Sequence, residues 1–163
     1  MPLKLHRFTD RLRLTARAYL DHRHGPLTDE LSLRDYTALP PGYNPRTVAW
    51  AEALRDEPRL AGAKPAQLVD AVMLHIRRGF TYTLTPGTYG DDSEGRFSID
   101  EFWLDRRQGF CEHFSTAFVV VMRALDIPAR VVTGYQGADN ELQDGFHVIR
   151  NSYAHAWAEV WIE

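Results

Sequence analysis

The sequence predicts a mixed α+β fold in a single domain. Apolar residues recur at helical spacing in the middle of the chain and after residue 111, and the last ten residues alternate as in a β-strand. A length of 163 residues fits one domain, because folding at this size buries roughly two-thirds of the surface that the unfolded chain exposes. We therefore expect one domain over 1–163, with a helical lead-in at 1–40 and a core at 41–163.

Composition narrows the class of protein. Hydrophobic residues make up 44% and charged residues 25%, which is ordinary for a globular chain and argues against disorder. The net charge of −3 gives no electrostatic reason to expect a nucleic-acid partner. The single cysteine, Cys111, excludes an intrachain disulfide. Because no apolar run is long enough to span a membrane and Met1–Asp10 lacks the apolar core of a signal peptide, we expect the chain as given to be soluble.

The first half of the chain is predicted to be largely helical. A first helix, Thr9–Asp21, has an arginine-rich face, which is typical either of a segment beside a membrane or of a solvated helix surface. Proline and glycine between Thr37 and Pro45 predict turns. The patterns that follow predict two helices, a short strand and a polar loop: Pro45–Arg55, Pro65–Arg78, Phe80–Leu84 and 86–95.

Cys111 is placed at the first turn of a fourth helix. Gly109 marks the turn before it, and the helix ends at Asp126-Ile127-Pro128. Its apolar stripe consists of Phe114, Ala117, Phe118, Val121, Met122 and Leu125. Unpaired N–H groups and the positive end of the helix dipole favour a thiolate, which is the nucleophilic form of cysteine. A lone cysteine is most often a small buried hydrophobe, but charged neighbours at a helix start favour a functional role here.

The candidate partner base is His155. It lies in Ala154–Ile162, where strict alternation places His155, Trp157, Glu159 and Trp161 on one face of a strand. His113 is two residues from Cys111 and would point away from it on a helix, so we interpret it as a surface or packing histidine. His147 begins a predicted strand, His147–Arg150, and is interpreted as a polar boundary residue.

A metal site is not expected. Cys111, Glu112, His113, His147 and His155 are all possible ligands, but they do not form a Cys-x-x-Cys or His-Glu-x-x-His pattern. No motif in the sequence implies a cofactor.

Three motifs follow one another along the chain: Gly109–Phe114, Ile127–Tyr135 and Ser152–Trp161. Together they resemble the bacterial transglutaminase-like superfamily of papain-type cysteine enzymes. The resemblance extends from about Tyr82 to the end. It implies a papain-like α+β fold in which the cysteine opens a central helix packed on an antiparallel sheet.

The resemblance also implies roles for individual residues. Cys111 and His155 would be catalytic, and Ile127–Tyr135 would be the strand that backs the site. Tyr82 is a possible oxyanion donor, although a packed strand aromatic is the simpler interpretation. The residues expected to support the site are Glu112, Arg130, Tyr135 and Trp157.

The aspartate that completes the family's triad follows the histidine on the next strand, and no acid after His155 replaces it. Glu159 is four residues along an extended strand, too far to orient the ring. We therefore expect the chain to be a fragment that lacks one or more C-terminal strands. Such a fragment would have weak or no turnover and an open strand edge that invites self-association.

Two functional hypotheses follow. The first is thiol-dependent acyl transfer on peptide or protein amides, by a transglutaminase or by a cysteine protease or amidase; the second is a non-catalytic binding or scaffold fragment of the same fold. Relatives that look similar carry this domain outside the cytoplasmic membrane, so a membrane-anchored parent with the domain facing the periplasm or exterior is expected.

Overall fold

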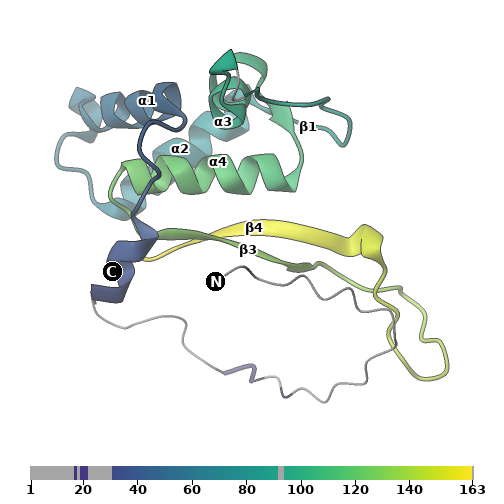
Figure 1. Ribbon diagram of the computed structural model, residues 1–163. Helices are drawn as coiled ribbons and strands as arrows, with labels where there is room; N and C mark the ends of the chain where they lie inside the picture. Colours follow the sequence, from purple (N-terminus) through teal and green to yellow (C-terminus); the bar gives the residue numbers. More distant parts are fainter. Residues whose placement is uncertain (1–16, 18, 22–30, 92–93, 163) are drawn as a thin grey trace, which may run out of the picture.

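The computed structural model describes residues 17, 19–21, 31–91 and 94–162, and shows a helical layer over a two-stranded antiparallel sheet (Figure 1). The elements in chain order are η1 Leu31–Tyr36, α1 Pro45–Arg55, η2 Pro58–Leu60, α2 Pro65–Gly79, β1 Thr81–Tyr82, α3 Ser98–Asp100, η4 Glu101–Arg106, β2 Gln108–Gly109, α4 Cys111–Ala124, β3 Ala129–Tyr135, η5 Asn151–Tyr153 and β4 Ala154–Val160. In Figure 1, α4 lies directly over the sheet, and α1 lies on the side of α4 that faces away from the sheet. This is the expected α+β arrangement with a central helix on an antiparallel sheet.

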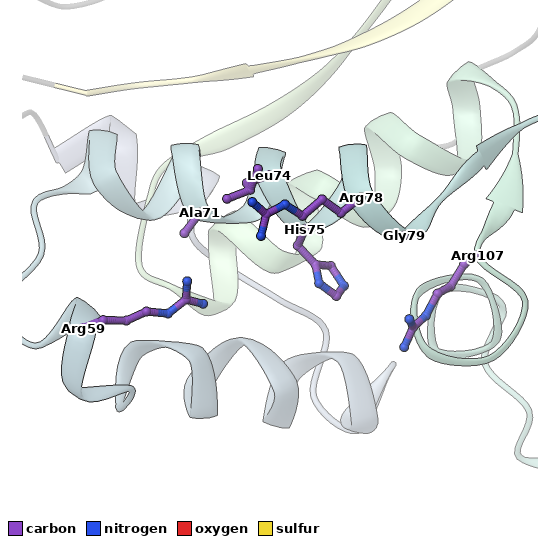
Figure 2. A pocket seen from close by; sticks show the side chains of 7 residues that line it. All are labelled: Arg59, Ala71, Leu74, His75, Arg78, Gly79 and Arg107. Carbon is purple, nitrogen blue, oxygen red and sulfur yellow. The ribbon is translucent and has the colours of Figure 1, made fainter.

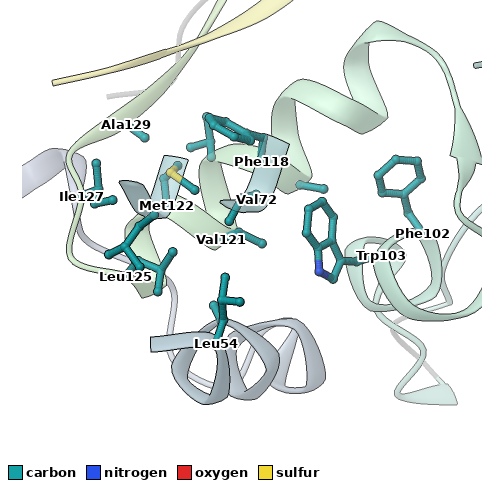
Figure 3. Close-up of a cluster of buried hydrophobic side chains, with 14 residues drawn as sticks. Leu54, Val72, Phe102, Trp103, Phe118, Val121, Met122, Leu125, Ile127 and Ala129 are labelled. Carbon is teal, nitrogen blue, oxygen red and sulfur yellow. The ribbon is translucent and has the colours of Figure 1, made fainter. Parts of the chain in front are cut away.

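Helix α4 is the centre of the hydrophobic core. Ala117, Val121 and Met122 on its apolar stripe are completely buried. In Figure 3 this stripe lies between Leu54 of α1 on one side and Ala129 of β3 on the other. Full burial of an aliphatic side chain of this size contributes roughly 1.5–3 kcal/mol, so the sequence pattern that predicted the helix also fixes its depth in the molecule.

Helices α1 and α2 confirm the sequence prediction closely. Each begins with a proline, whose missing N–H would in any case lack a partner in the first turn. On α2, Leu68 and Val72 are buried and Ile76 packs against the core. The two helices thereby form the wall of the core that faces away from the sheet.

The first turn of α1 is capped by a residue from α3. The buried carboxylate of Asp100 accepts hydrogen bonds from the backbone N–H groups of Thr47 (2.7 Å) and Arg46 (3.2 Å). In return, the side-chain oxygen of Asn44 accepts a hydrogen bond from the N–H of Ile99 (3.2 Å). A carboxylate at a helix N-terminus satisfies free donors and opposes the positive end of the dipole, so α3 is held against α1.

A cluster of aromatic rings fills the space between α1, α2 and η4. The fully buried indole of Trp103 lies 5.1 Å from Trp50 and 5.4 Å from His75, between ring centroids. Phe80 lies 5.0 Å from Trp103 and 5.4 Å from Phe102. Rings at these tilted geometries each contribute beyond their buried area, and the cluster extends the core from α1 toward the start of α4.

The sheet pairs β3 and β4 in antiparallel register from Ala129 opposite Val160 to Tyr135 opposite Ala154. Ala156 is buried, and Ala158 and Val160 pack against the core. Alternation therefore directs this set toward the helices and places His155 on the other face of β4.

A short parallel pair, β1 and β2, guides the chain into α4. Tyr82 is opposite Gly109, and the N–H of Thr83 donates to the carbonyl of Gly109 at 2.8 Å. A β-carbon at Gly109 would lie 2.8 Å from the β-carbon of His113 and 3.0 Å from the ring of Phe102. Only glycine leaves room for this turn.

Two predicted elements differ from the structure. Only Thr81–Tyr82 of the strand expected at Phe80–Leu84 forms a ladder. His147–Arg150 is not a strand, because this loop is closed by side chains: Asp139 accepts from Tyr153 (2.7 Å) and pairs with Arg150 (2.5 Å). The helix expected at Thr9–Asp21 falls almost entirely outside the described residues.

Among the described residues, helices long and apolar enough to cross a bilayer are absent.

We predict that Gly109→Ala destabilises the chain by about 1–3 kcal/mol, because the added methyl group forces His113 or Phe102 to move in a packed region. Urea unfolding at neutral pH measures this. Gly79→Ala is the matched control, since its β-carbon would meet only the Arg107 side chain at 3.8 Å. It should be neutral or slightly stabilising. Equal losses in the two variants would contradict the close approach at Gly109.

Protonation of the half-buried His75 should lower the free energy of unfolding in mild acid. Burial, followed by the charge of Arg107, lowers the pKa of His75 below its usual 6.5. A lower pKa in the folded state means that the unfolded chain binds more protons in mild acid. The contribution of the neutral His75 ring to the free energy of unfolding is therefore complete above pH 6.5 and is lost as the pH falls below it. Unfolding free energies at pH 7.5 and 5.5 test this. His75→Phe, which retains a ring beside Trp50 and Trp103, should show a smaller difference; an unchanged difference would exclude His75 as a cause.

Candidate active site

Cys111 is the first residue of α4 and is half-buried. The first hydrogen bond of the helix is donated by Phe114 to the carbonyl of Phe110, at 3.2 Å. The N–H groups of Cys111, Glu112 and His113 therefore precede the helical ladder. Such N–H groups, at the positive end of a helix, can stabilise a thiolate and can hold a developing oxyanion.

His113 packs beneath the first turn of α4. Its ring centroid lies 4.5 Å from Phe110 and 4.9 Å from Tyr89, and its Nδ1 accepts a long hydrogen bond from the N–H of Phe110 (3.4 Å). Burial lowers the pKa of His113; Glu112 opposes this shift and Arg106 adds to it. A neutral ring is needed for Nδ1 to accept. The residue was interpreted as a surface or packing histidine, and the structure places it in the packing role.

His155 is the second residue of β4 and is half-buried. It lies opposite Gly134 in the ladder. The indole of Trp157 covers Gly134, since a β-carbon there would be 3.1 Å from the ring. Trp157 therefore fixes the strand surface next to His155, although 39% of its own surface remains exposed.

The structure brings the two elements of the predicted dyad to the same end of the molecule. In Figure 1 the beginning of α4 and the beginning of β4 lie at the same end of the helix and sheet layers. Within the described residues, however, no hydrogen bond joins Cys111 to His155. Catalytic hydrogen bonds in unliganded enzymes are often long or unformed, and the dyad stays a prediction.

Of the expected supporting residues, Arg130, Tyr135 and Trp157 lie on the sheet, whereas Glu112 is the second residue of α4 and is exposed. Arg130 and Glu159 are directly opposite each other and form an exposed ion pair at 2.8 Å. The hydrogen bond that Arg130 donates to Glu159 is the main cause that raises the pKa of Arg130. Exposed ion pairs of this kind contribute little to the free energy of folding. We interpret this pair as favouring the observed register of the two strands. Tyr135 ends β3 and is mostly exposed.

Tyr82 lies beside the chain that enters α4. Its ring stacks on Phe114, with centroids 5.9 Å apart and planes at 16°, while 57% of the residue is exposed. Its hydroxyl makes no hydrogen bond within the part of the chain that the structure describes. Tyr82 is opposite Gly109, two residues before the predicted nucleophile.

Sequence reasoning missed a clamp around Arg106. This side chain lies over the ring of Tyr89 at 4.0 Å, donates to the carbonyls of Thr88 (2.7 Å) and Pro86, and pairs with Glu101 (3.3 Å). The hydroxyl of Tyr89 donates to the carbonyl of Gln108. The loop before α3 is thereby fastened beside the chain that leads to the nucleophile.

Ionisation within the clamp follows from these contacts. The N–H of Gly90 donates to Glu101 at 2.9 Å and is the main cause that lowers the pKa of this carboxyl, with Arg106 adding to it. Burial raises the pKa of Tyr89. The segment η4 that carries Glu101 and Arg106 is a π-helix, an uncommon form that is frequent at functional sites. Its wider winding gives no signal in the sequence.

Groups of three or more possible metal ligands are not found among residues 17, 19–21, 31–91 and 94–162.

Comparisons with known proteins agree with this geometry. A family model described as the transglutaminase-like superfamily matches residues 49–163. A protein-glutamine gamma-glutamyltransferase of Pseudomonas aeruginosa is 42% identical over 124 residues, which cover 76% of this chain and 17% of that protein. The uncharacterized protein YebA of Bacillus subtilis is 33% identical over 86 residues, 50% of this chain and 11% of that protein. The chain thus spans less than a fifth of these curated relatives.

Solved structures give the same result. The periplasmic domain of TgpA from Pseudomonas aeruginosa, solved also with ethylmercury bound, matches with a TM-score of 0.69 at 38% identity, over 81% of this chain and 45% of that one. A Cytophaga hutchinsonii structure described as a candidate cysteine protease matches at 20% identity with a TM-score of 0.54, over 82% of this chain and 39% of that one, and shares the fold alone. From the matched residues and the arrangement of α4 on the sheet, the chain belongs to the transglutaminase-like superfamily.

Proposed function

We propose that this chain carries the nucleophile and base for acyl transfer on peptide or protein amides. His155 takes the proton of the Cys111 thiol, and the sulfur forms a bond to the amide carbonyl carbon. The carbon–nitrogen bond then breaks, and the amine leaves with the proton that His155 returns. Water or a second amine then attacks the thioester and returns the thiol. Each step transfers one acyl group and needs no cofactor.

The observation that carries this proposal is the position of Cys111. It is half-buried at the first residue of the most deeply packed helix, whereas a structural cysteine gains most from full burial inside such a helix. The N–H groups of the first turn are available to the oxyanion that forms during attack. Tyr82, on the neighbouring strand, is a second possible donor.

His155 is proposed as the base because β4 begins at the end of the molecule where α4 begins. By alternation His155 faces away from the buried Ala156, so the proposal requires its side chain, at the start of β4, to turn toward Cys111 when substrate binds. Tyr135 and Trp157 would act by shaping the sheet near His155, Glu112 by its position in the first turn of α4, and Arg130 by its pairing with Glu159 farther along the strands. None of them needs to touch the reacting atoms.

The substrate we propose is a protein glutamine side chain, with an amine as the acceptor. The support is the relative described as a protein-glutamine gamma-glutamyltransferase. Water as acceptor would make the same thioester chemistry a hydrolysis. Because a relative's matching domain is periplasmic, we also propose that this domain works outside the cytoplasmic membrane, in a parent that is anchored there.

A non-catalytic binding role is the second candidate. It is favoured by one observation, the absence of a hydrogen bond between Cys111 and His155 within the described residues. In that case the surface around Cys111 would hold a peptide without turnover. The two candidates differ in the reactivity of the thiol.

We predict that folded Cys111 reacts with iodoacetamide at pH 7 at least about tenfold faster than the same thiol in the urea-unfolded chain, because the helix start and His155 favour thiolate. His155→Ala should remove most of this advantage, whereas His147→Ala, in an exposed loop, should not. The chain has one cysteine, so mass spectrometry of the adduct gives the rate directly. A thiol that reacts only after unfolding in all three chains would support the non-catalytic role.

A further inference from the structure

A hollow of about 290 Å³ opens on the helical layer, away from the predicted catalytic residues (Figure 2). It is lined by Arg59, Ala71, Leu74, His75, Arg78, Gly79 and Arg107. Three of these seven residues are arginines and none is acidic, although the whole chain has a net charge of −3. Positive charge is therefore concentrated here against the overall balance.

The arginines come from three separate segments and are poorly neutralised. Arg59 pairs with Glu57 at 2.5 Å. Arg78 and Arg107 form no ion pair or side-chain hydrogen bond within the described part of the chain. Figure 2 shows the three guanidinium groups around the space next to His75. The lining thus keeps a charge near +2.

The helix dipole explains the position of only some of these arginines. Arg77 and Arg78 lie in the last turn of α2, where basic side chains are favoured by the negative end of the dipole. That reason does not apply to Arg59 on η2 or to Arg107, which follows η4. Arg107 also holds a left-handed backbone conformation, with φ of 52°, which is uncommon for a residue with a long side chain.

His75 provides a second, independent observation. Its Nε2 atom is buried and has no hydrogen-bond partner among the described residues. Buried polar atoms without a partner are exceptions in native proteins, and a bound water or ion is one of their recognised explanations. The ring is held beside the hollow by Trp50, at 4.6 Å between centroids.

We propose that this hollow binds the phosphate group of a small molecule or of a lipid headgroup. Guanidinium groups present paired N–H donors that match phosphate oxygens, and a concave site strengthens their field. Phosphate carries about −1.5 to −2 at neutral pH and so balances the lining, whereas a carboxylate carries only −1. The volume is at the lower end for small-molecule sites, roughly 300 Å³, and leaves room for the group that bears the phosphate.

The test is binding of inorganic phosphate and glycerol phosphate to the whole chain, measured by calorimetry and by NMR of the His75 ring. We expect saturable one-to-one binding that weakens with salt. Arg78→Gln and Arg107→Gln should each weaken it about tenfold or more, because each removes a charged pair of hydrogen bonds. Arg77→Gln, the neighbouring charge on α2, is the matched control and should bind as the unchanged chain does.

The His75 signal distinguishes binding in the hollow from binding elsewhere. Arg107 contributes to the lowered pKa of His75, so an anion beside Arg107 should raise that pKa. If Arg78→Gln and Arg107→Gln lose the response of His75 to phosphate while Arg77→Gln keeps it, the loss comes from the charge removed at the hollow. Thermal unfolding of each variant checks that it is folded.

Vesicles of phosphatidylcholine with and without phosphatidylglycerol distinguish the two sources. If the chain sediments with the anionic vesicles and free phosphate releases it from them, the ligand is a lipid headgroup. If the chain binds only the free compounds, the ligand is a soluble molecule. The proposal is overturned if phosphate does not bind, if Arg77→Gln weakens binding as much as Arg78→Gln, or if acetate binds as tightly as phosphate.

Discussion

The structure depends on the packing of α4 between two partners. Its apolar stripe contacts α1 and α2 on one side and the β3–β4 sheet on the other, and several of its side chains are completely buried. The same helix carries the half-buried Cys111 at its beginning. Whatever fixes the depth and tilt of α4 in the core therefore also fixes the position of the thiol, and core stability and site geometry are one property.

Around the start of α4 the fold adds contacts that hold a few residues in place. Gly109 lets the chain pass close to His113 and Phe102, and His113 accepts from the backbone just before Cys111. Arg106 fastens the neighbouring loop. These groups are positioning residues in this account: they set where the first-turn N–H groups point, which is what a developing oxyanion would meet.

Local sequence patterns predicted the elements that have strong periodicity. The bounds of α1, α2 and α4, and the alternation in β4, follow from side chains that each element must bury. What was missed depends on partners distant in sequence. Asp100 caps a helix 53 residues earlier, and β-branched residues at 148–149 do not form a strand because the side chain of Asp139 closes that loop. No sequence pattern predicts the π-helix η4, and none predicts that three arginines lie around His75.

The measurement that tests the central claim most directly is intact-mass spectrometry after brief exposure to p-nitrophenyl acetate at pH 7. If Cys111 is a nucleophile held ready by the start of α4, the chain gains one acetyl group on that residue, and Cys111→Ala gains none. If the two chains are labelled equally, or the label maps to lysines, then α4 places a cysteine at its N-terminus without making it reactive, and the catalytic account is wrong.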